Sequence, residues 1–202
     1  MPGRTGQELQ QAKAKAAERF QQIALQILQD ASVNTWAYHE KGLRGRAWPK
    51  KRHVVCPKPT TRRRLYILAH ECAHVALHHV RSKPSHRQEF EAELYAHAAL
   101  TRYDIAVPQQ ETDRARGYVA YRIDQAIRIG RAKRLDRAAV EWSAGKHGVA
   151  TKRALRDGAV ELVDLGGRKR KQQPSPSKGQ RPKRPRTIAE KVRAVAKAGG
   201  LG

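Results

Sequence analysis

The stretch that decides the fold is LYILAHECAHVALHHV, residues 65–80, a nearly continuous apolar run punctuated by histidine and glutamate. Pro57 and Pro59 end the segment before it, and Thr60 or Thr61 is placed to cap a helix. A helix of this composition is buried, so its polar side chains need partners. The sequence therefore predicts a central, buried helix over 65–80.

The middle of this run carries the pattern His-Glu-x-x-His at His70, Glu71 and His74. Because a helix advances roughly 100° per residue, the two histidines lie about 40° apart and one turn along, so both imidazoles can reach one ion. Glu71 lies beside that pair and can hydrogen-bond a zinc-bound water without being a ligand. Zinc lowers the pKa of that water towards about 7, so Glu71 is predicted to act as general base and to pass the proton to a leaving amine. The pattern predicts zinc-dependent peptide hydrolysis.

A second helix is predicted over 85–103, since Ser85 and Gln88 have the spacing of a capping box and Pro108 closes the element. Small side chains would allow this helix to approach the first one closely. These are Ala73 on the first helix and Ala92, Ala96 and Ala99 on the second.

The third zinc ligand is expected from this second helix. Glu89, Glu93 and His97 are spaced by four and share one face, whereas Glu91 is expected to point to solvent. We expect Glu89 to be the ligand, in the first turn, where the helix dipole favours a carboxylate. Glu93 is expected to orient a ligand imidazole through its other nitrogen. The reverse assignment of Glu89 and Glu93 stays open at this point.

A group that stabilises the tetrahedral oxyanion is also required, and the sequence offers His97, Tyr95 and Tyr103 without singling one out. His78 and His79 continue the predicted helix beyond the motif. His78 is interpreted as an interfacial or solvated histidine, with a place in the lining of the cleft as the alternative.

Two stretches, 67–79 and 89–96, resemble the gluzincin metallopeptidases of the ImmA/IrrE type, including compact versions on phages and other mobile elements. The resemblance covers roughly 54–108, about a quarter of the chain. It implies a zinc peptidase that cleaves a DNA-bound repressor or a related regulator. Glu93 stands where this family more often has Asp or Asn, and the strand expected over 52–56 resembles the edge strand against which such enzymes lay an extended substrate. Carried over by position, the implied ligands are His70, His74 and Glu89, and the implied base is Glu71.

The fold class is predicted as α+β, mainly helical: a minimal zincin-like domain over 1–165, followed by a disordered basic tail over 166–202. The small sheet is expected to be an antiparallel pair formed by 33–39 and 52–56. The remaining helices are expected over 7–30, over 112–129 and in a short segment that Asp136 caps and Trp142 ends.

The chain of 202 residues has 42 Lys and Arg against 18 Asp and Glu, a net charge of +24, which favours a polyanionic partner. The tail holds 12 of these cations and one acid, Glu190, among prolines and polar residues with too little apolar area to order itself. We expect it to bind nucleic acid non-specifically through counterion release. No Phe, Trp or Tyr follows Trp142, so base stacking by the tail is not expected. The predicted contacts are Arg168, Lys169, Arg170, Lys171, Lys183, Arg184 and Arg186, although 183–186 would equally suit a nuclear address or an acidic protein surface.

Cysteine usage and hydropathy indicate the compartment. Cys56 and Cys72 cannot form a disulfide framework, and Cys72 is expected to face the core. Residues 1–20 do not resemble a secretory signal, and no apolar run approaches the roughly 18 residues of a membrane span. The expected location is cytoplasmic, in association with the nucleoid, with no membrane partner.

These features predict a zinc-dependent metalloendopeptidase that acts on a DNA-associated or regulatory protein, with the tail raising its local concentration near DNA. The alternative is a non-catalytic, basic nucleic-acid-associated protein of a mobile element, with a structural or vestigial zinc site. A third class is a cationic adaptor with no metal. The substitution Glu71→Gln separates the first two, because only the peptidase depends on this carboxylate.

Overall fold

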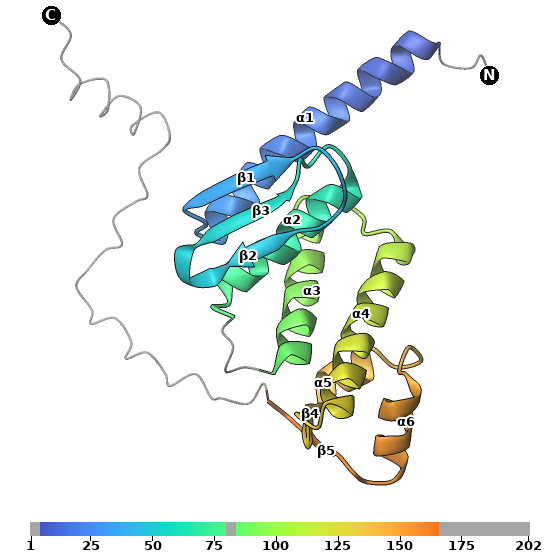
Figure 1. Ribbon diagram of the computed structural model, residues 1–202. Helices are drawn as coiled ribbons and strands as arrows, with labels where there is room; N and C mark the ends of the chain where they lie inside the picture. The colour runs from blue at the N-terminus through green and yellow to red at the C-terminus, as the bar shows by residue number, and fades with distance from the viewer. Residues whose placement is uncertain (1–4, 80–83, 166–202) are drawn as a thin grey trace, which may run out of the picture. The chain divides into compact units, whose positions relative to one another are not determined.

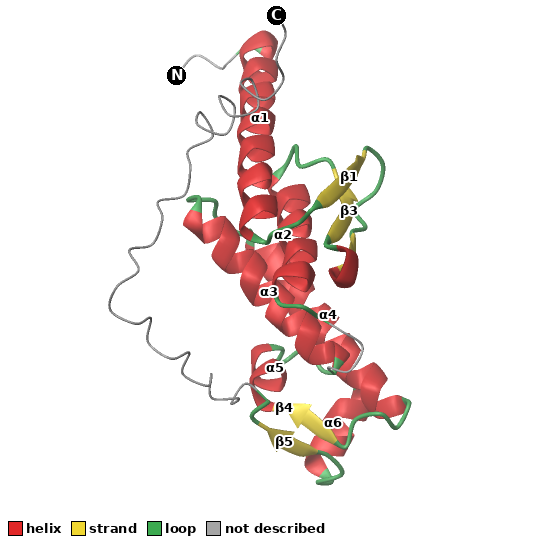
Figure 2. Cartoon of the chain, turned by 90° about the vertical axis from the view of Figure 1, so that its left-hand side faces the viewer, coloured by secondary structure: helices red, strands yellow, loops and turns green. Residues whose placement is uncertain are grey.

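The computed structural model describes residues 5–79 and 84–165, and these described residues belong to one compact unit. This part of the chain is mainly helical with two small sheets, as predicted for an α+β domain, although one sheet was expected (Figures 1 and 2). The candidate nucleic-acid contacts between Arg168 and Arg186 lie outside the described residues and stay predictions.

The elements follow one another along the chain and confirm the predicted helices, with some ends shifted. They are α1 (Gly6–Asp30), β1 (Thr35–His39), β2 (Arg46–Trp48), the 3-10 helix η1 (Pro49–Lys51), β3 (His53–Pro57), α2 (Arg62–Ala76), α3 (Ser85–Arg102), α4 (Gln109–Arg128), β4 (Arg134–Asp136), α5 (Arg137–Trp142), α6 (Val149–Arg156) and β5 (Glu161–Val163).

The first sheet has the strand order β1-β3-β2 and lies against α2 (Figure 1). The predicted antiparallel pairing of its first and last strands is wrong: β1 runs parallel to β3, from Thr35 opposite His53 to His39 opposite Pro57. The chain between them forms the unpredicted strand β2, which takes the antiparallel position beside β3. Since β3 is paired on both sides, it is not the edge strand that the resemblance implied. The edge next to α2 is β2.

Helix α2 lies at the centre of the main core, in contact with α1, α3, β2 and β3. The Thr61 hydroxyl caps its first turn by accepting a hydrogen bond from the backbone N–H of Arg64 at 3.3 Å. Cys72 is completely buried, as predicted. The helix ends at Ala76 rather than at residue 80, because His78 adopts a left-handed conformation with φ of 49°.

Helix α3 packs closely against α2, and Ala73, Ala92 and Ala96 at this contact are fully buried, as predicted for small side chains. The predicted capping box is wrong. Pro84 is the N-cap residue and Ser85 the first residue of α3, so its side chain makes no cap hydrogen bond. As a result, Glu89 lies in the second turn rather than the first, away from the strongest effect of the helix dipole.

A second, smaller core joins α4, α5 and β4 through residues such as Val119, Ile123 and Leu135. Asp136 caps α5 by accepting from the backbone N–H of Ala139 at 3.0 Å, as predicted.

Candidate metal centre

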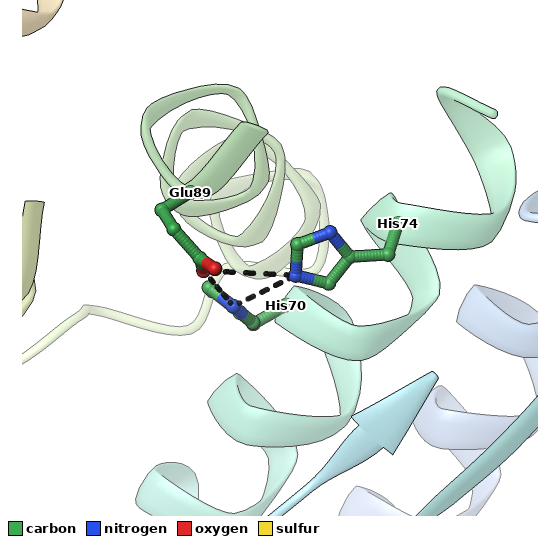
Figure 3. A group of neighbouring side chains, drawn as sticks. All are labelled: His70, His74 and Glu89. Carbon is green, nitrogen blue, oxygen red and sulfur yellow. Dashed lines mark hydrogen bonds and ion pairs between the residues drawn. The ribbon is translucent and has the colours of Figure 1, made fainter. Parts of the chain in front are cut away.

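Two turns of α2 and one residue of α3 bring three ligand atoms together (Figure 3). Nε2 of His70 and Nε2 of His74 are 3.2 Å apart. Oε2 of Glu89 lies 3.3 Å from the first nitrogen and 3.7 Å from the second. Because the side chain of Glu89 is only 13% exposed, this triangle forms at the floor of a cleft rather than on an open surface.

The triangle has the size that a small divalent ion requires. Four ligands about 2.0–2.1 Å from a tetrahedral zinc lie about 3.3–3.4 Å from one another, and the three observed separations bracket that value. The donor set of two imidazoles and one carboxylate is also typical of catalytic zinc sites that keep a fourth position open. His70, His74 and Glu89 can therefore hold a metal ion, as the sequence predicted.

Glu93 contacts the ring nitrogen of His70 that faces away from the triangle. Its Oε1 lies 3.3 Å from Nδ1 of His70, and its Oε2 accepts a hydrogen bond of 2.5 Å from the Tyr66 hydroxyl. Because Glu93 engages Nδ1, Nε2 of His70 faces Glu89 and His74. This geometry favours Glu89 as ligand and Glu93 as the orienting carboxylate over the reverse assignment.

The second histidine is supported by two residues whose role the sequence analysis missed. Nδ1 of His74 lies 2.8 Å from Nδ1 of His79, and Nε2 of His79 lies 3.0 Å from Oε2 of Glu91. For Nε2 of His74 to face an ion, its Nδ1 must carry the proton and donate it to His79, which in turn donates to Glu91. The expectation that Glu91 points to solvent is therefore wrong. His78 is exposed, in agreement with its interpretation as a solvated histidine, whereas His79 is buried.

Arg87 connects Glu91 to Asp136, the N-cap residue of α5. The Arg87 guanidinium contacts Oε1 of Glu91 through Nε at 2.8 Å and through Nη2 at 2.7 Å. Its Nη1 donates to Oδ2 of Asp136 at 2.5 Å. Two hydrogen bonds from one guanidinium fix the orientation of the Glu91 carboxylate.

The ionisable groups of the site change one another's pKa values. Burial alone lowers the pKa of His70, but hydrogen bonds to Glu89 and Glu93 outweigh it and raise that pKa to about 10. Burial and the neighbouring charge of His70 lower the pKa of His74 to about 4. One proton is therefore held on His70 across the neutral range, between two carboxylates.

Glu71 lies beside the triangle and lines the floor of the same cleft, close to the residue that precedes β2. Burial raises the pKa of its carboxyl group to about 7, with Glu89 and Glu93 raising it further and His70 opposing them. The backbone of Gly45 approaches so closely that a Cβ there would lie 2.5 Å from Oε1 of Glu71. The glycine is thus required for the observed position of this carboxylate.

A cleft of about 1260 Å³ runs past the metal ligands, between the β2–η1 segment on one side and α4 on the other. The three candidates for oxyanion stabilisation are absent from its described lining. Tyr95 and Tyr103 line a different pocket beside α1, and His97 packs edge-to-face against Tyr66. Tyr118 of α4, which the sequence analysis did not consider, lines the metal cleft instead. A helical pattern alone gives no signal for it, because its position depends on how α4 packs.

None of the helices in residues 5–79 and 84–165 combines the length and the apolar character that crossing a membrane requires. Comparisons of the chain with protein-family models, with curated proteins and with solved structures found no match.

Proposed function

We propose that the protein is a zinc-dependent metalloendopeptidase. The observation that carries this proposal is the triangle of His70, His74 and Glu89 with Glu71 beside it in the same cleft. A purely structural ion needs no adjacent carboxylate outside its ligand set and no open cleft, whereas hydrolysis needs both.

Zinc bound at the triangle would supply Lewis acidity and make water a better nucleophile near neutral pH. Glu71 would accept the proton of the attacking water and deliver it to the leaving nitrogen. The Tyr118 hydroxyl is a candidate donor to the developing oxyanion. Burial and the nearby carboxylate of Glu89 raise the pKa of Tyr118, so this hydroxyl keeps its proton at neutral pH.

The substrate would lie extended along β2, whose three residues pair with β3 on one side and line the cleft. Backbone hydrogen bonds to an edge strand align a peptide without reading its side chains. We further propose that the target is a DNA-associated or regulatory protein, as it is for peptidases of the ImmA/IrrE type. The association of the basic tail with nucleic acid is also part of the proposal.

The decisive experiment compares the full chain with its Glu71→Gln variant. We expect both proteins to bind about one equivalent of zinc and only the first to cleave peptides, with a loss of about 10²–10⁴-fold in rate for the variant. His74→Ala is the control that loses the metal. Equal cleavage by the protein and its Glu71→Gln variant would contradict the proposal. If neither cleaves and zinc stays bound, the alternative of a non-catalytic nucleic-acid-associated protein with a structural site is favoured.

A further inference from the structure

The charges that line the metal cleft are arranged with opposite signs at its floor and its walls. The acidic residues in the described lining are Glu71 and Glu89, both at the metal centre. The cationic residues come from two walls: Arg46, Lys50 and Lys51 on β2 and η1, and Arg122 and Arg131 on α4 and just after it.

Most of these cations have no carboxylate partner in the part of the chain that the structure describes. Within residues 5–79 and 84–165, no Asp or Glu lies within ion-pair distance of Arg46, Lys50, Lys51 or Arg131, whereas many cations elsewhere are paired, for instance Arg102 with Asp30 at 2.7 Å. Arg122 has only a long contact of 3.9 Å with Glu89. The positive charge of the walls is thus available to a ligand.

One wall is also held in a fixed position. The guanidinium of Arg46 lies 4.8 Å from the centre of the Trp48 ring, and Trp48 packs in turn against His53 of the neighbouring strand β3 at 5.1 Å. A cation–π contact of this kind restricts the side chain without neutralising its charge.

A nucleic acid fits this pattern poorly, because each of its phosphates is negatively charged and would be repelled by the carboxylates at the floor of the cleft. A peptide fits it well, since its backbone is neutral at the scissile bond while acidic side chains on either side can reach the walls. In an extended peptide, successive side chains are about 3.3 Å apart and alternate in direction, so acids near the scissile bond can face both walls.

We propose that the cleft selects peptide segments in which Asp or Glu flank the scissile bond, with the unpaired cations of β2–η1 and of the end of α4 as the specificity determinants. This inference rests on the proposed peptidase function. It does not follow from the net charge of the chain, because it assigns the preference to four named cleft residues.

The test uses the zinc-loaded full chain and three short fluorogenic peptides that share an apolar centre and carry glutamate, glutamine or lysine on both sides of it. The variants are Lys50→Gln/Lys51→Gln and Arg131→Gln. Their matched control is Lys13→Gln/Lys15→Gln, which removes the same charge as the first variant from exposed positions on α1, away from the cleft. A binding assay with labelled peptides and zinc-loaded Glu71→Gln protein reports the preference without catalysis.

We expect kcat/KM to be highest for the glutamate peptide. In the Lys50→Gln/Lys51→Gln variant, the ratio of kcat/KM for the glutamate peptide to that for the glutamine peptide should fall about fivefold because KM for the glutamate peptide rises. The control should keep the original ratio. Equal cleavage of the glutamate and glutamine peptides, or an equal loss in the control, overturns the inference and leaves the peptidase function standing. Failure to cleave any peptide contradicts the peptidase function, and the binding assay then decides the preference of the cleft by itself. Displacement of the glutamate peptide by a single-stranded oligonucleotide, weakened by the cleft variants and not by the control, would show a nucleic-acid site and overturn the inference.

Discussion

Gly45 offers a way to move the proposed general base without touching the metal ligands. A Cβ at this position would lie 2.5 Å from Cγ and Oε1 of Glu71 and 2.8 Å from Cδ. Ordinary contacts between such atoms begin at about 3.5 Å, so the carboxylate must move by about 1 Å. The side chain of Glu71 can give way and Gly45 does not have a positive φ, so Gly45→Ala is expected to fold and to bind zinc normally. A displacement of this size is expected to lower kcat by about 10²-fold.

The assay measures zinc affinity by competition with a chelator and kcat on a fluorogenic peptide for the same preparation. Gly6→Ala is the matched control, since a Cβ there meets nothing within 4 Å. Unchanged kcat in Gly45→Ala would refute the reasoning, because it would mean that the position of Glu71 does not matter for the reaction. Loss of zinc would refute it differently, by showing that the site does not tolerate the local shift.

Three further changes test other parts of the site and fold. Zinc binding at pH 7 should release one proton from His70, since that ring is protonated below its pKa of about 10. The apparent zinc affinity should therefore rise with pH between about 4 and 10. Calorimetry in buffers of different ionisation enthalpy measures the release, and binding without proton release would contradict a protonated His70. Glu93→Gln should weaken zinc binding by about 10–100-fold in chelator competition, whereas unchanged affinity would show that His70 needs no orienting charge. Asp136→Ala should lower the free energy of unfolding by about 2–4 kcal/mol in denaturant titration, since it removes the α5 cap and the partner of Arg87; a loss below about 0.5 kcal/mol would argue against both roles.

The ligand triangle could be predicted because every part of it depends on spacing within a helix. His70 and His74 are one turn apart on α2, and Glu89 and Glu93 are one turn apart on α3. Helical periodicity therefore placed each pair on one face before the structure was known. Alanines such as Ala92 on α3 predicted a close approach of the two helices, and the complete burial of Ala92 agrees with it.

The sheet could not be predicted in the same way because strand direction is not a local property. The segment 40–51 is rich in glycine and basic residues, which is typical of a loop, yet Arg46–Trp48 within it forms β2. Three residues give too short a pattern to distinguish a strand from a loop. Once β2 occupies the antiparallel position beside β3, β1 takes the other side of β3 and runs parallel to it.

The support of His74 was missed because it depends on where α2 ends. If the helix had continued to residue 80, His79 would point elsewhere; instead the left-handed turn at His78 folds the chain back, and the backbone N–H of His79 donates to the carbonyl of His74 at 3.0 Å. Nδ1 of His79 then accepts a hydrogen bond from Nδ1–H of His74, and Nε2–H of His79 donates one to Glu91. The two histidine ligands are thus supported differently: His70 contacts the carboxylate of Glu93 directly, whereas His74 is connected to Glu91 through the neutral imidazole of His79. Because Glu89 and Glu93 hold a proton on His70 when no metal is bound, the same two carboxylates that stabilise that proton would stabilise the ion that replaces it.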